Sequence, residues 1–123
     1  MIGKACVSVF KYYDVRTQQM SFKKRPVLII GQADETDFVA LPISRVSKKE
    51  FLDPVYDVPI SPENFPAMNL KQVSYIRAHK QAVISRTEIT YDIADFKRLY
   101  PDKFCEILDK VSDFQEKMIR ISR

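Results

Sequence analysis

Apolar residues fall into short, strand-length runs over the first two thirds of the chain. Ala5–Phe10 is the first run, and Val27–Ile30 is an unbroken apolar run of the kind that marks a strand buried on both faces. Phe38–Ile43 follows after a turn region that contains the turn formers Asp34 and Asp37. The pattern therefore predicts three strands within the first 43 residues.

The segments between and after these runs are more polar. Residues 13–25 are polar and basic and show no helical stripe, so we expect a mobile loop there. Further elements are expected as strands at Tyr56–Ile60, Val73–Arg77 and Gln81–Ser85, a short helical turn at Ser47–Leu52 and a loop at Ser61–Pro66.

The hydrophobic period changes near Asp92. Residues 92–99 fit a short helix, and Pro101 suits the first turn of a longer one. Three- and four-residue spacing then marks a helix with one buried face, formed by Phe104, Ile107, Leu108, Val111, Phe114, Met118 and Ile119. The order predicts a single mainly β domain over residues 1–123, with about six short strands within residues 2–90 and a helical part within 92–120. We expect a small, antiparallel, partly closed barrel with the C-terminal helix packed on it.

Composition narrows the classes of function. The 123 residues carry a formal net charge of +4, which suits a polyanionic partner and equally a solvated, lysine-rich surface. Two glycines are too few for a glycine-rich phosphate loop. Two cysteines and one histidine give neither a disulfide framework nor a zinc site, and we expect Cys6 and Cys105 to be buried thiols. Since every apolar run is only strand-length, we expect no signal peptide, no membrane span and a cytoplasmic location.

One stretch carries candidate chemistry. Lys23, Lys24 and Arg25 lead into the second apolar run, and Ser44 and Arg45 end the third. If these two strands pair antiparallel, the basic segment lies beside the end of the returning strand. Arg25, Ser44 and Arg45 then converge, and a guanidinium beside a hydroxyl among other cations suits a phosphodiester.

The same stretch resembles the MazF/PemK family, the toxins of toxin–antitoxin pairs. Arg25–Ile30 is similar to the family's Arg-Pro-Val-Leu-Val-Ile segment, Leu41–Ser44 to its strand ending in Thr, and Leu70–Arg77 to its Leu-x-x-x-Ser-x-Val-Arg strand. The resemblance covers about residues 2–90 and implies an SH3-like, CcdB/PemK-type barrel and a homodimer. It also implies cleavage of single-stranded RNA without a metal or cofactor, and inhibition by a cognate acidic antitoxin peptide.

The resemblance assigns four catalytic positions. Arg25 matches the family's catalytic arginine, and Ser44 stands where the family has threonine. Arg77 matches an arginine of the later strand, and His79 falls where some members have aspartate. Serine keeps the hydroxyl but loses the methyl that limits its rotamers. Histidine reverses the available chemistry, and its cationic neighbours are expected to disfavour its protonation, as a general base requires.

An RNA strand also needs a surface to lie on. Cations that would form a positive groove are Lys23, Lys24, Arg45, Lys48, Lys49, Arg77 and Lys80, and rings that would stack on bases are Tyr12, Tyr13, Phe22 and Tyr75. The alternative interpretation is a solvated face for the lysines and core packing for the rings. The serine and histidine departures favour a non-catalytic RNA- or protein-binding module, and CcdB-type gyrase inhibitors share the expected fold. The pairing of Arg25 with Ser44 favours the nuclease.

Overall fold

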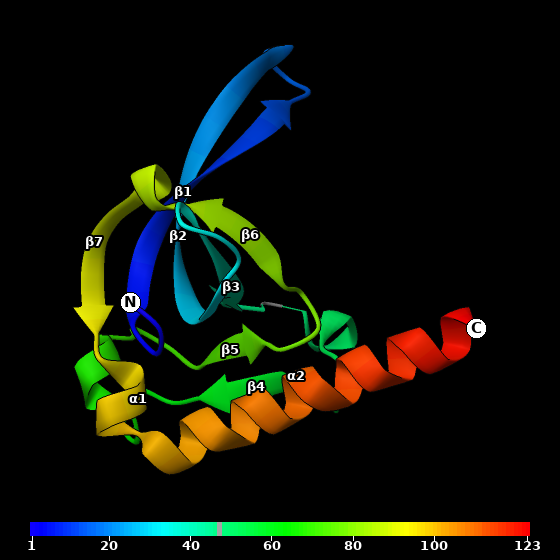
Figure 1. Ribbon diagram of the computed structural model, residues 1–123. Helices are drawn as coiled ribbons and strands as arrows, with labels where there is room; N and C mark the ends of the chain where they lie inside the picture. The colour runs from blue at the N-terminus through cyan, green and yellow to red at the C-terminus, as the bar shows by residue number, and fades with distance from the viewer. Residues whose placement is uncertain (47) are drawn as a thin grey trace.

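A curled antiparallel sheet forms half of a barrel, and a long C-terminal helix lies alongside one end of it (Figure 1). This computed structural model describes residues 1–46 and 48–123. The strands are β1 Ala5–Asp14, β2 Gln19–Gln32, β3 Asp37–Ser44, β4 Asp57–Ile60, β5 Ser74–Arg77, β6 Ala82–Ser85 and β7 Ile89–Ala94. Single 3₁₀ turns are η1 Lys49–Phe51, η2 Pro66–Met68 and η3 Arg86–Glu88, and the helices are α1 Phe96–Leu99 and α2 Pro101–Ser122.

The strands follow the order β4-β5-β3-β2-β1-β7, with β6 as a second partner of β3. Every pairing is antiparallel. β3 is shared, since Asp37–Ala40 pair with β6 whereas Ile43 and Ser44 pair with β5. The expectation of a mainly β chain with a C-terminal helix is confirmed. The expected helix over residues 92–99 is partly wrong, because β7 runs to Ala94 beside β1 and α1 begins only at Phe96.

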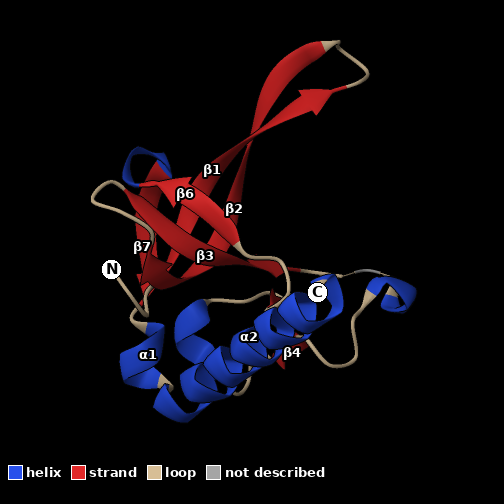
Figure 2. Cartoon of the chain, turned by 45° about the vertical axis from the view of Figure 1, so that its right-hand side comes forward, coloured by secondary structure: helices blue, strands red, loops and turns tan. Residues whose placement is uncertain are grey.

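The first two strands form a long hairpin that projects from the body of the sheet (Figures 1 and 2). Its register runs without a break from Ala5 opposite Leu28 to Asp14 opposite Gln19. The expectation of a mobile loop over residues 13–25 is therefore wrong. The outer half of the hairpin has no core beneath it, so most of its side chains are exposed, apolar ones included, and its ladder of backbone hydrogen bonds holds it.

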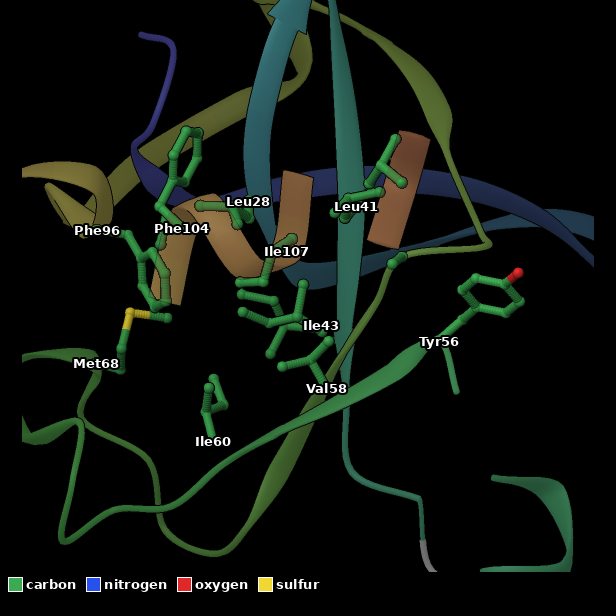
Figure 3. Close-up of a cluster of buried hydrophobic side chains, with 14 residues drawn as sticks. Leu28, Leu41, Ile43, Tyr56, Val58, Ile60, Met68, Phe96, Phe104 and Ile107 are labelled. Atoms are coloured by element: carbon green, nitrogen blue, oxygen red, sulfur yellow. The ribbon is translucent and has the colours of Figure 1, made fainter. Parts of the chain in front are cut away.

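The central strands are buried on both faces, as the unbroken apolar run predicts. Alternate residues go to two clusters: Leu28 and Leu41 to the one next to α2, and Val27 and Ile29 to the one on the other face. Figure 3 shows the first cluster, in which side chains from β1, β2, β3, β4 and β5 meet those of α1 and α2. Its labelled members are Leu28, Leu41, Ile43, Tyr56, Val58, Ile60, Met68, Phe96, Phe104 and Ile107.

Pro101 begins α2, and the helix buries one face along its first half. Phe104, Ile107 and Val111 are buried, and Leu108 and Phe114 pack beside them. Met118 and Ile119 are half exposed, so the expected core stripe stops short of the end of α2. No helix in the described part of the chain is long and apolar enough to cross a membrane.

Of the smaller expectations, two are confirmed and one is wrong. The short helical turn expected at residues 47–52 is present as η1, while Ser47 itself lies outside the described residues. Cys6 is buried as expected. Cys105 is exposed on α2, which corrects the expectation for that thiol.

Candidate phosphate-binding site

A hollow of about 750 Å³ opens where β3 ends beside the middle of β2. Its apolar wall includes Val7, Pro26 and Ile43. We call it the basic hollow, after the five cations that line it: Lys23, Lys24, Arg25, Arg45 and Lys71. Ser44, Ser74, Asn69 and Tyr91 supply polar groups. The expected convergence of Arg25, Ser44 and Arg45 is therefore confirmed.

Strand register explains how Arg25 and Ser44 meet. The paired part of β2 and β3 ends at Val27 opposite Pro42, so Arg25 and Ser44 each lie two residues beyond the last pair, on neighbouring strands. Ser44 in turn pairs with Tyr75 of β5. Directly opposed residues share a face, so Ser44 and Tyr75 share one, with Cβ atoms roughly 5 Å apart. Tyr75 thus lies beside the candidate site although it does not line the hollow.

Lys24 lies on the other face of β2. Along this unbroken stretch side chains alternate, so Lys24 shares its face with Pro26 and Arg25 lies opposite to both. Both Lys24 and Arg25 line the basic hollow. Lys24 and Arg25 are therefore adjacent, exposed and equally charged, but differently directed.

The basic hollow is electrostatically one-sided. Its lining residues include no carboxylate, and none of its five cations forms an ion pair within the described residues. Uncompensated cations around a concave surface concentrate anions there. The site is therefore suited to an anionic group such as a phosphate.

Arg77 does not line the hollow, since it is engaged in a buried ion pair. Its Nε donates to Asp57 Oδ1 at 2.9 Å, and its Nη2 donates to Asp57 Oδ2 at 3.3 Å and to the carbonyl of Phe51 at 3.3 Å. The Asp57 side chain is only 1% exposed and also accepts from the backbone N–H of Asp53 at 2.8 Å. Arg77 thus ties β4, β5 and η1 together, and its guanidinium is directed away from β3.

His79 also lies away from the basic hollow, packed between Tyr56 and Phe114 of α2 with both ring centroids 6.1 Å away. Its side chain is 12% exposed, and its Nδ1, 3.9 Å from Asp57 Oδ1, has no hydrogen-bond partner among the described residues. Burial lowers the pKa of His79 below 6.5, Asp57 opposes that shift, and Arg77 adds to it. The expected direction of the pKa shift is confirmed, although burial rather than cationic neighbours is its main cause.

The expected groove of cations divides into two groups. Lys23, Lys24 and Arg45 line the basic hollow with Arg25. The other cations do not line it: Lys48 and Lys49 lie at η1, and Lys80 follows the end of β5. Among the expected stacking rings, Tyr13 and Phe22 are exposed on the hairpin, and Lys23 Nζ lies 5.4 Å from the centre of the Tyr12 ring. The core interpretation of these three rings is therefore wrong.

Four polar residues of the basic hollow were not predicted as site residues from the sequence, namely Asn69, Lys71, Ser74 and Tyr91. Lys71 and Asn69 lie in the segment after η2, where the family resemblance assigned a role only to Arg77, further along the chain. Tyr91 belongs to β7. This strand was not predicted, because Asp92 and the helix-like spacing after it indicated a helix over residues 92–99. An exposed tyrosine beside isoleucines at two-residue spacing (Ile89, Tyr91, Ile93) was the available signal.

The described residues include no candidate metal-binding cluster. No group of three or more His, Cys, Asp or Glu side chains within residues 1–46 and 48–123 is placed to hold a metal ion.

Compared with known proteins, the chain matches no protein-family model and no curated protein.

Proposed function

We propose that this protein is a metal-independent endoribonuclease of the MazF/PemK toxin type that cleaves single-stranded RNA, including mRNA, in the cytoplasm. In this proposal the half-barrel is the SH3-like, CcdB/PemK-type barrel. The observation that carries the proposal is the basic hollow, which Arg25 and Ser44 line together with four further cations that form no ion pair among the described residues. The segments that resemble the family are the same ones that build this site.

The chemistry follows from the substrate's own groups. The 2′-oxygen attacks the adjacent phosphorus, the bond from phosphorus to the 5′-oxygen breaks, and the products are a 2′,3′-cyclic phosphate and a 5′-hydroxyl end. Arg25 would donate two parallel N–H bonds to phosphate oxygens as negative charge grows on them, and it stays charged throughout. The Ser44 hydroxyl would donate to the same phosphate or orient the 2′-hydroxyl.

Proton transfer distinguishes this site from one with a built-in base. The residues lining the basic hollow include neither a carboxylate nor an imidazole, and His79 packs against α2 instead. The 2′-hydroxyl proton would then pass to hydroxide from solvent, and the leaving 5′-oxygen would take a proton from water. The cleavage rate would consequently rise steadily with pH between about 6 and 8.

The uncompensated charge also bears on partners. An acidic antitoxin segment would complement the cations of the basic hollow and exclude RNA from it. In the proposal the toxin is a homodimer, in which two such hollows would be present.

A second candidate is an RNA-binding module of the same fold without catalysis. It is favoured by one observation, namely that Arg77 and His79 are engaged elsewhere, which leaves the hollow without a proton acceptor. The two candidates predict the same RNA affinity and differ only in cleavage.

The test is incubation of purified protein with a long single-stranded RNA in EDTA, with cut sites and end groups mapped. Arg25→Ala is the test variant. Arg98→Ala is its matched control, since it removes an equal charge from an exposed position that does not line the basic hollow. Discrete cuts that leave 5′-hydroxyl ends, are lost in Arg25→Ala and persist in Arg98→Ala support the nuclease. Intact RNA with folded protein favours the binding module.

A further inference from the structure

A second, smaller hollow of about 270 Å³ adjoins the basic hollow and shares part of its wall. Both are lined by Met68, Asn69, Tyr91 and Ile93, and Asp92 completes the smaller one. Its volume is that of about nine liquid waters, which leaves room for one heterocyclic base. The two hollows together therefore offer a charged part and a less charged part of one continuous surface.

Tyr91 gives the smaller hollow a free aromatic face. Its side chain is 60% exposed on β7, the edge strand of the sheet. Tyr91 pairs with Val7, which pairs with Pro26, so the three side chains share one face of the sheet. Lys24, two residues from Pro26, also lies on that face and lines the basic hollow. A ring that stacks on a base therefore has, on the same face, a cation for the attached phosphate.

Asn69 provides a free hydrogen-bonding edge in the same hollow. It ends η2, which packs beside β7, and it is exposed with a left-handed backbone at φ 54°. Its amide makes no hydrogen bond within the described residues, which leaves an N–H donor and a C=O acceptor free. Side-by-side donor and acceptor groups of this kind can pair with one edge of a base.

The one carboxylate here does not oppose a nucleic acid strongly. Asp92 lies 3.3 Å from Lys4 Nζ, so its charge is paired. The local charge is therefore strongly positive in the basic hollow, with its five cations, and close to neutral beside Tyr91 and Asn69.

From this arrangement we infer that the smaller hollow is a nucleobase subsite, in which Tyr91 stacks on one base of a single-stranded RNA and Asn69 reads its edge. The phosphate attached to that nucleotide lies in the basic hollow, so this inference rests on the proposed function. Tyr91 and Asn69 then determine which base is accepted next to the phosphate that Arg25 contacts.

The test uses RNA that cannot be cleaved, so that binding is measured apart from catalysis. Fluorescently labelled 2′-O-methyl hexamers of all four bases are titrated with protein in EDTA, alongside hexamers in which one nucleotide at a time is abasic. For the wild type, one abasic position should weaken binding at least fivefold. Tyr91→Ala should weaken binding of the intact hexamer by the same factor and abolish the abasic penalty, whereas Tyr91→Phe should retain it.

Two further variants sharpen the test. Asn69→Gly keeps the left-handed backbone accessible and should reduce the preference among the four bases without losing the abasic penalty. Phe51→Ala is the matched control, because it removes an equally exposed ring, 65% exposed, from η1 outside both hollows.

Four results would overturn the subsite: no hexamer bound by the wild type, no abasic penalty, a penalty that survives in Tyr91→Ala, or an equal loss in Phe51→Ala. Failure of the proposed function gives a different result. In that case wild-type protein binds the hexamers with the Tyr91-dependent penalty and yet leaves ordinary RNA uncut.

Discussion

Replacing Arg77 by alanine should lower the free energy of unfolding without abolishing RNA cleavage at the basic hollow. The change leaves Asp57, whose side chain is 1% exposed, without the two N–H donors at 2.9 and 3.3 Å. The carbonyl of Phe51 loses its donor as well. Breaking a buried ion pair from one side costs about 3–5 kcal/mol.

The lower end of that range applies, because the Arg77 side chain is still 22% exposed and water screens part of its charge. We therefore expect a loss of about 3 kcal/mol in the free energy of unfolding, which is roughly a hundredfold in the folding equilibrium. For a chain of this size the corresponding fall in melting temperature is roughly 10 °C.

The assay is urea unfolding followed by circular dichroism, with the midpoint compared at an unchanged slope. Arg98→Ala is the matched control. Its Nε lies 3.5 Å from Asp95 Oδ2 in an exposed pair, so its removal should cost less than about 1 kcal/mol. RNA cleavage by Arg77→Ala, corrected for the fraction folded, should stay within about threefold of wild type. Equal stability of the two variants would refute the structural role of Arg77, and a folded Arg77→Ala protein that binds RNA but no longer cuts it would place Arg77 in the reaction.

Three further predictions concern single buried or strained positions. Burial lowers the pKa of His79, so the folded protein resists taking up a proton that the unfolded chain binds near pH 6.5. The free energy of unfolding should therefore be constant above that pH and decline below it until the pKa of the folded protein is passed. Urea midpoints measured from pH 7.5 to 5 should show a shallower decline for His79→Gln than for the wild type. Gly3 has φ +90°, and a Cβ there would lie 2.5 Å from Lys97 Cβ, so Gly3→Ala should lower the free energy of unfolding by about 2 kcal/mol or more; a midpoint equal to wild type would contradict this. The Ser8 hydroxyl is fully buried without a partner among the described residues, so Ser8→Ala should leave the melting temperature unchanged or raise it slightly, and a clear fall would reveal a hydrogen bond that this account lacks.

Local pattern predicted the parts of the fold that local burial determines. Val27–Ile30 is apolar throughout because its alternate residues enter two different clusters, and Pro101 marks the start of α2 because its missing N–H costs nothing there. The outer hairpin was not predicted because it is exposed on both faces. A strand exposed on both faces has no alternation to detect. In β7 only Ile89, Ile93 and Ala94 pack against the clusters, so its alternation is short and was not recognised.

The same limit explains the candidate site. Arg25 and Ser44 could be brought together from the sequence because a single turn joins their strands, which fixes the register between them. Arg77 and His79 were assigned through family resemblance, but their positions depend on Asp57 and Phe114, which are distant in sequence. No local pattern contains such a contact.

The central claim is that Arg25 and Ser44 act together on one phosphodiester, and a double-mutant cycle tests it most directly. Single-turnover cleavage of a short RNA with one mapped site is measured in EDTA for wild type, Arg25→Ala, Ser44→Ala and the double variant. We predict a loss of about a hundredfold or more for Arg25→Ala, a smaller loss for Ser44→Ala, and a double variant little worse than Arg25→Ala alone. Strictly additive losses, or cleavage that persists in Arg25→Ala, would contradict the account.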